Sequence, residues 1–101
     1  MEVIADRAVA TELVNIVADP SHGTARQMFV LALGRLGDRD SIPTLIRLLE
    51  EDGVAGHAAA ALGKMVAHEA GPMLERLAIS GTPWVRREAV KALKRIAKSR
   101  Q

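Results

Sequence analysis

A short stretch with two glycines is the first candidate for chemistry. Residues 32–40 read ALGRLGDRD, with Gly34 and Gly37 three residues apart beside basic and acidic side chains. A phosphate-binding loop would follow a strand and open a helix, but no strand pattern precedes this stretch. The Ala-Leu-Gly triplet also returns at 61–63. A glycine inside a helix costs about 1 kcal/mol relative to alanine, so we interpret the repeated glycine as a point of close helix packing and Gly37 as a helix end.

The remaining polar residues give little support for catalysis or metal binding. The histidines, His22, His57 and His68, lack the i, i+4 spacing of a helical zinc site, and the chain has no cysteine. The serines lie in expected turns or near the C-terminus, and no two carboxylates have a spacing that suggests an acid/base pair. We therefore expect no catalytic residue, no metal site and no cofactor. His57 is expected to be partly buried and hydrogen-bonded.

The composition favours a small all-α domain. Of the 101 residues, 49% are hydrophobic but only 2% are aromatic, which suits closely packed helices better than a β-sandwich. Without cysteine the chain forms no disulfide, and no apolar stretch approaches the ~20 residues of a membrane span. No signal peptide is apparent at the N-terminus. These features predict one domain over residues 1–101, located in the cytoplasm and not in a membrane.

An internal repeat organises this domain. The segment ALGRL at 32–36 returns as ALGKM at 61–65 and as ALKRI at 92–96, at offsets of 29 and 31 residues. Downstream of the first two copies, IPTLIRLL at 42–49 matches GPMLERLA at 71–78. Because several separate landmarks keep the same offsets, the repeat is a property of the whole chain rather than of one motif.

Each repeat unit is predicted to contain two helices, because its apolar residues recur at three- and four-residue spacing. Pro43 and Pro72 lie near helix starts, where a missing N–H has no cost, and Ser41 is the expected N-cap. First-type helices are expected at about 24–36, 54–67 and 84–98, and second-type helices at about 8–18, 41–51 and 70–79.

The expected architecture is an α-solenoid, a right-handed superhelix of about six antiparallel helices. Breakers such as Gly81-Thr82-Pro83 separate the helices. The units are a partial repeat at about 1–22, repeats at 23–53 and 54–82, and a C-terminal capping helix at 83–101.

The repeat resembles the HEAT-repeat family, in particular the short phycobilin-lyase-type HEAT-like repeat. The matching residues are ALGRLGD at 32–38, IPTL at 42–45 and VRREA at 85–89. The resemblance implies stacked helix pairs whose second helices line a concave face, in proteins that mostly bind other macromolecules and do no chemistry. Some related folds act on bilins or on DNA. Fold alone does not give function.

The second-type helices supply the candidate binding residues, because the concave face is the usual binding surface of such a stack. Arg47 and Arg76 occupy equivalent positions and could pair with partner carboxylates. The alternative is an ordinary surface pair between Arg47 and Glu51, four residues on. The residues predicted to bind a partner on this face are Glu12, Asn15, Thr44, Arg47, Glu51, Met73 and Arg76.

The last helix carries an excess of positive charge. Residues 84–101 hold seven Lys/Arg and one acid, Glu88, whereas residues 1–83 hold seven Lys/Arg and eleven Asp/Glu. Lys91 and Lys94 stand where the inner repeats have small or apolar residues, so we expect a solvated cap that ends the stack. The alternative is contact with phosphates or an acidic partner. The candidate residues for that contact are Arg86, Arg87, Lys91, Lys94, Arg95 and Lys98.

Two further features concern helix ends and the only tryptophan. Arg35, Lys64 and Arg95 form a ladder at the ends of the first-type helices. We expect their side chains to reach terminal carbonyls or turn acids such as Asp38. Trp84 is expected either to anchor a partner or, in the alternative that we favour, to close the last apolar layer.

The N-terminal helix is expected to leave apolar residues on more than one face, at Val3, Ile4, Val9, Val14 and Val17. A second copy of the chain or a partner is expected to cover this edge. The predicted function is therefore a non-catalytic protein-interaction module or small adaptor. The alternatives are a nucleic-acid-binding protein that uses the basic last helix, and an accessory subunit of a bilin lyase-type enzyme.

Overall fold

The computed structural model describes residues 9, 11–16, 25–51 and 53–99. Residues 11–16 are helical, and one-turn 3₁₀ helices at Arg39–Ser41 and His68–Ala70 precede two of the later helices. No strand occurs in these ranges. The bounded α-helices are α2 (Ala25–Leu36), α3 (Ile42–Leu48), α4 (Ala55–Lys64), α5 (Gly71–Ser80) and α6 (Pro83–Ser99). The predictions for Val3, Ile4, Val17 and His22 lie outside the described residues.

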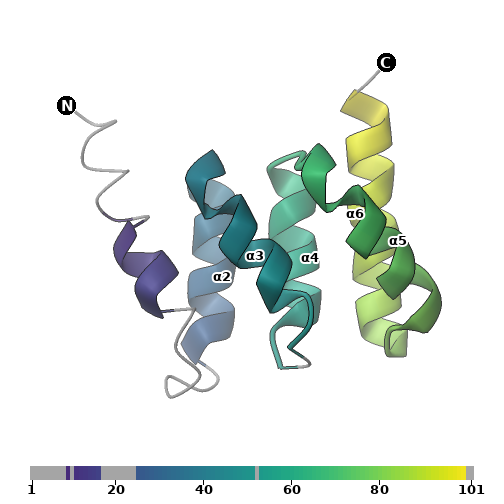
Figure 1. The fold of residues 1–101 in the computed structure, drawn as a ribbon, viewed down its shortest axis with the longest axis horizontal. Coiled ribbons are helices and arrows are strands. Elements are labelled where there is room, and N and C mark those ends of the chain that lie inside the picture. The colour runs from purple at the N-terminus through teal and green to yellow at the C-terminus, as the bar shows by residue number, and fades with distance from the viewer. Residues whose placement is uncertain (1–8, 10, 17–24, 52, 100–101) are drawn as a thin grey trace.

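The helices form two layers. The first-type helices α2, α4 and α6 lie side by side, and α3 and α5 lie in front of them in the view of Figure 1. Helix α4 packs against α2 on one side and against α6 on the other, while α3 packs on α4 and α5 packs on α6. This arrangement confirms the predicted all-α solenoid of repeated helix pairs.

Two glycines set the spacing within the layer of first-type helices. A Cβ atom at Gly34 would lie 2.9 Å from both Cα and Cβ of Ala61 in α4, and a Cβ at Gly63 would lie 2.8 Å from Cα of Ala92 in α6. Real Cβ atoms do not approach other atoms this closely, so each glycine allows a contact that no other residue fits. The interpretation of the repeated glycine as a packing point is confirmed.

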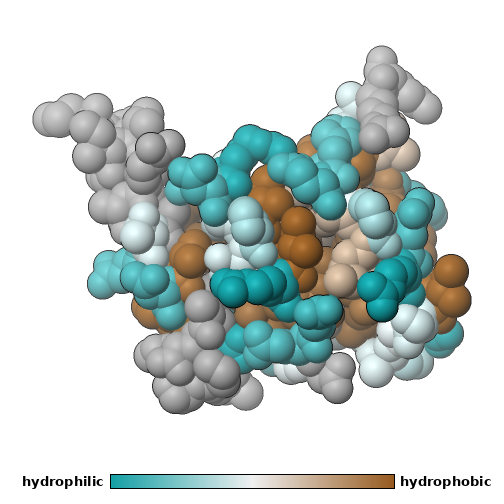
Figure 2. All heavy atoms as spheres, in the orientation of Figure 1, coloured by the Kyte–Doolittle hydropathy of each residue, from teal (hydrophilic) through white to brown (hydrophobic). Residues whose placement is uncertain are grey.

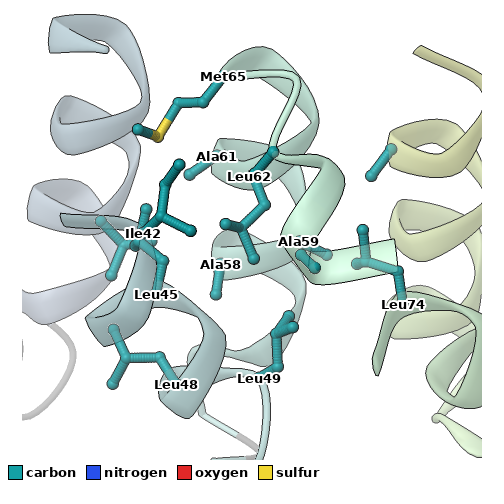
Figure 3. Close-up of a cluster of buried hydrophobic side chains, with 14 of the residues drawn as sticks. Ile42, Leu45, Leu48, Leu49, Ala58, Ala59, Ala61, Leu62, Met65 and Leu74 are labelled. Atoms are coloured by element: carbon teal, nitrogen blue, oxygen red, sulfur yellow. The ribbon is translucent and has the colours of Figure 1, made fainter. Parts of the chain in front are cut away.

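The core between the layers is aliphatic, as the composition indicated. Leu33, Leu45, Leu62 and Leu74 are fully buried. Small residues on α4 let its neighbours approach, and Figure 3 shows leucines from α3 and α5 pointing toward them. The buried residues of α4 are Ala55, Gly56, Ala58, Ala59, Ala61, Leu62 and Gly63.

The turns after α2 and α4 use the same left-handed backbone with different residues. Gly37 has φ +69°, and its N–H donates to the carbonyl of Leu33 at 3.1 Å, which confirms that it ends α2. The equivalent residue after α4 is Val66, at φ +52°, a conformation that is strained for a β-branched side chain. This turn ends α4 at Lys64, three residues before the predicted end.

The helix starts follow the prediction in part. Pro43 and Pro72 lie in the first turn of α3 and α5, as expected. Ser41 stands at the N-cap position of α3 but makes no side-chain cap, because its hydroxyl donates to the carbonyl of Asp38 at 2.6 Å. The side chain of Asp38 caps the preceding 3₁₀ helix instead, where it accepts from the N–H of Asp40 at 3.0 Å.

The close contact between α4 and α6 generates a stability prediction. Substitution Gly63→Ala should lower the free energy of unfolding by roughly 1–3 kcal/mol, because the added methyl group meets helix backbone that cannot move aside cheaply. The matched control is Gly71→Ala, since Gly71 has helical φ −49° and open space around a Cβ. Urea titrations of both variants provide the measurement, and equal stability of the two would contradict the packing role of Gly63.

Candidate binding surfaces

The first candidate surface is the α3–α5 face, which we define by Arg47, Met73 and Arg76. Both arginines are exposed and Met73 is partly buried. Figure 2 shows this side of the molecule, where polar side chains cover the two helices and hydrophobic surface lies between them. Neither arginine forms an ion pair with a described residue, so both guanidinium groups are available to a carboxylate.

The other residues predicted on this face differ in exposure. Glu12 and Asn15 are exposed on the helical segment 11–16. Thr44 is only 9% exposed, because it lies on the buried side of α3 with residues 42, 45 and 48. We therefore leave Thr44 out of the binding surface.

Glu51 has a structural partner that spacing along one helix did not indicate. Its Oε1 accepts from Nη2 of Arg26 at 3.0 Å, and the side chain of Arg26 is only 8% exposed. The alternative in which Glu51 pairs with Arg47 is therefore wrong. The ion pair joins the start of α2 to the end of the α3 segment and so links the two layers of one repeat.

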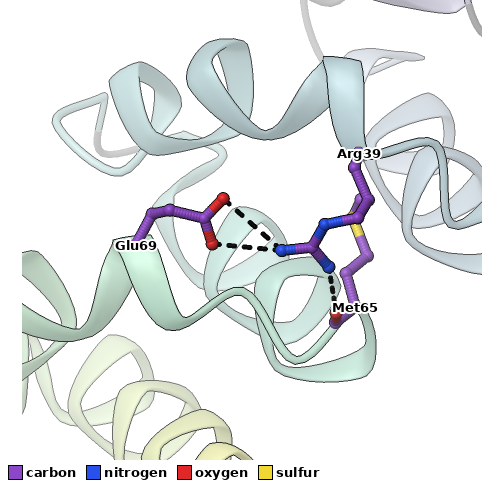
Figure 4. Close-up of polar contacts among 3 residues, drawn as sticks. All are labelled: Arg39, Met65 and Glu69. Atoms are coloured by element: carbon purple, nitrogen blue, oxygen red, sulfur yellow. Dashed lines mark hydrogen bonds and ion pairs between the residues drawn. The ribbon is translucent and has the colours of Figure 1, made fainter.

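A second charged contact links neighbouring repeats at the opposite end of the helices. Nη1 of Arg39 donates to the carbonyl of Met65 at 3.3 Å, and Nη2 lies 3.2 Å from Oε1 of Glu69, as Figure 4 shows. The sequence predicts that Arg35 reaches a terminal carbonyl or a turn acid such as Asp38, but among the described residues it is Arg39 that forms bonds of this kind. One sequence signal could have indicated this contact. Arg39 stands in the turn after Gly37, and its side chain reaches the corresponding turn of the next repeat.

The basic residues of α6 form the second candidate surface. All six predicted residues are exposed, as expected of a solvated helix. The only ion pair among them within the described part of the chain joins Lys91 to Glu88 at 3.5 Å.

Trp84 lies at the start of α6 and packs over α4. Its ring occupies the space where a Cβ of Gly56 would be, 2.1 Å from Cζ3. The ring also meets His57 edge to face at a centroid distance of 5.0 Å, yet Trp84 stays 41% exposed. His57 is partly buried, but its Nδ1 is buried without a hydrogen-bond partner, so the expected hydrogen bond is absent. The packing supports the layer-closing role of Trp84.

The described residues contain no group of three or more His, Cys, Asp or Glu side chains that could hold a metal ion. Within the same ranges, no helix combines the length and apolar character that crossing a bilayer requires.

The two arginine contacts lead to a prediction about stability. Arg26→Ala should lower the free energy of unfolding by roughly 2–3 kcal/mol, because it removes a charge-assisted hydrogen bond from a buried group. Arg39→Ala should cost less than about 1 kcal/mol, since that pair is more than half exposed on both sides. Thermal and urea unfolding of the two variants would test this order, which the reverse ranking would refute.

The contact of Trp84 with Gly56 leads to a spectroscopic prediction. Gly56→Ala should push the indole toward solvent and shift its fluorescence emission to longer wavelength. Stability should change by less than about 1 kcal/mol, because the higher helix propensity of alanine offsets the lost ring contact. Gly53→Ala is the control, since nothing lies near a Cβ there. Identical emission of wild type and Gly56→Ala would show that the ring does not rest on Gly56.

Comparison with known proteins supplies the family. A family model described as HEAT repeats matches residues 10–94, a range that includes both glycine contacts and both arginine links. Comparisons with curated proteins and with solved structures found no match. The match agrees with the layered helix pairs and the glycine-spaced contacts described above, and the chain belongs to the HEAT-repeat family.

Proposed function

We propose that the chain is a non-catalytic scaffold that binds another protein through the α3–α5 face. The observation that supports this proposal is that Arg47 and Arg76 are exposed and have no carboxylate partner among the described residues. The two side chains occupy equivalent positions in successive repeats. Arg39, by contrast, already binds a carboxylate and a backbone carbonyl within the fold.

The surroundings of the two arginines fit a protein partner. Met73 lies three residues before Arg76 on α5 and is partly buried, so apolar surface adjoins Arg76 on the same face of the helix. Arginine beside apolar surface is typical of the energetically dominant part of protein interfaces. A planar guanidinium also binds a carboxylate through two parallel hydrogen bonds, which fixes the orientation of the partner.

Three parts of the sequence-based prediction stay open beside this proposal, namely the N-terminal edge, the cytoplasmic location and the bilin lyase alternative. The N-terminal edge is represented among the described residues by Val9, which is 47% exposed, and by partly buried Val14. Self-association there predicts a concentration-dependent mass in light scattering. The cytoplasmic location and the bilin lyase alternative remain predictions, the latter testable with a bilin-binding assay.

The test is affinity capture from a lysate of the source organism, with and without nuclease. Arg47→Glu combined with Arg76→Glu should lose the captured protein, because the substitution replaces two attractive charges by repulsive ones. The control combines Arg86→Glu with Arg87→Glu, which changes net charge equally on α6. The proposal fails if the control loses the partner and the α3–α5 variant retains it, or if nuclease alone abolishes capture.

A further inference from the structure

The first-type helices carry most of the positive charge of the described residues. The first-type helices α2, α4 and α6 carry nine Lys/Arg and a single carboxylate, Glu88. The other described carboxylates lie in turns, on α5 or on the helical segment 11–16. These are Glu12, Asp38, Asp40, Glu50, Glu51, Glu69 and Glu75.

The two-layered fold is thick enough for a ligand on one face to respond mainly to the charges of that face. The shortest dimension of the Cα trace is 16 Å, while the Debye length at physiological ionic strength is about 8 Å. Glu88 on α6 and Glu51, which pairs with Arg26 of α2, offset only part of the positive charge of the first-type helices. A ligand that approaches this outer face meets positive charge.

A groove between α4 and α6 lies on the outer face. It encloses about 280 Å³ and is lined by side chains of both helices and by Leu31 of α2. Gly63 and Ala92, which form the close contact between α4 and α6, also line the groove. The apolar lining residues are Leu31, Ala60, Ala61 and Ala92.

Three cations, Lys64, Lys91 and Arg95, line the same groove together with one carboxylate, Glu88, so its charged lining is net positive. Lys64 and Arg95 occupy equivalent repeat positions, both are exposed, and neither pairs with a described carboxylate. The expectation that they reach helix-terminal carbonyls is not met in the described structure. Lys91 pairs with Glu88 at 3.5 Å, where the glutamate side chain is only 16% exposed, so Lys64 and Arg95 are the two groove cations without a described ionic partner.

The lining selects between two kinds of anionic ligand. A nucleic-acid backbone would use the cations but would gain nothing from the apolar lining, and no aromatic side chain lines the groove to stack on a base. A peptide with an apolar side chain between carboxylates would use both, because the apolar group leaves water while the carboxylates meet the cations.

We propose that the groove between α4 and α6 binds an acidic peptide segment of a partner protein. An apolar side chain of the peptide fills the groove, and carboxylates on either side pair with Lys64 and Arg95. The proposal shares with the proposed function only the assumption of a protein partner. It concerns the opposite layer from Arg47 and Arg76, so the two surfaces can be tested independently.

The experiment uses the full chain and a fluorescein-labelled synthetic peptide in which leucines are flanked by glutamates. The same peptide with glutamine in place of glutamate is the matched ligand control, and a labelled duplex DNA is the nucleic-acid probe. Fluorescence anisotropy should show the acidic peptide binding about tenfold more tightly than its glutamine version. Addition of the acidic peptide should change the NMR chemical shifts of the backbone amides of Ala60, Ala61 and Ala92.

Three variants with equal change in net charge separate the explanations. Lys64→Glu with Arg95→Glu should weaken acidic-peptide binding by about tenfold or more. Arg86→Glu with Arg87→Glu, outside the groove, and Arg47→Glu with Arg76→Glu, on the α3–α5 face, should change it by less than about threefold. Circular dichroism confirms that each variant is folded.

Three results would overturn the proposal. The first is no detectable binding of the acidic peptide. The second is equal weakening by all three variants, which would mean attraction by net charge alone. The third is tighter binding of the duplex that is lost with Lys64→Glu and Arg95→Glu, which would make nucleic acid the ligand of the groove. None of these results bears on capture of a partner by the α3–α5 face.

Discussion

The structure depends on the close approach of helix backbones at two glycines. Gly34 rests on Ala61 and Gly63 rests on Ala92, so α2, α4 and α6 form one layer whose spacing is set by the absence of two Cβ atoms. The small residues of α4 serve the same end, because a helix that packs on both sides can carry few large side chains. The remaining features, from the leucines of α3 and α5 to the groove between α4 and α6, occupy the space that this layer leaves.

Much of this architecture could be predicted from the sequence, because it follows from local pattern. The three- and four-residue apolar spacing gave the helices, and the repeated Ala-Leu-Gly gave the packing points. The side-chain partners could not be predicted in the same way. Arg26 meets Glu51 across 25 positions and Arg39 meets Glu69 across 30, and such pairs depend on how a turn aims the chain. Two pairs that lie closer in sequence, Arg47 with Glu51 and Arg35 with Asp38, do not form in the described part of the chain. Glu51 pairs with Arg26 instead, and Asp38 accepts from the N–H of Asp40 in its own turn.

The sequence predicted the exposed cations of the candidate surfaces correctly, but it did not predict features that depend on how separate helices pack. Arg47, Arg76 and the cations of α6 are exposed, as their positions on amphipathic helices indicated. Thr44 is buried, although the equivalent Met73 of α5 stays partly exposed after a similar 3₁₀ turn, so the repeat position alone did not indicate its exposure. The groove on the outer face could not be read from one helix alone, since its cations come from α4 and α6 together. Both faces of the scaffold present exposed cations, Lys64 and Arg95 at the groove and Arg47 and Arg76 on the α3–α5 face.

The junctions at the two glycines have a consequence for the mechanics of the stack. Glycine and alanine have no side-chain rotamers, so these contacts form without loss of side-chain entropy. A small slide of α6 along α4 therefore requires no rotamer change at Gly63 or Ala92, in contrast to interdigitated leucines, which would have to repack. The contact between Gly63 and Ala92 therefore fixes the separation of α4 and α6 without fixing any side-chain rotamer. The resistance of the stack to such a slide comes instead from its leucines, since those of α3 and α5 are packed between the layers.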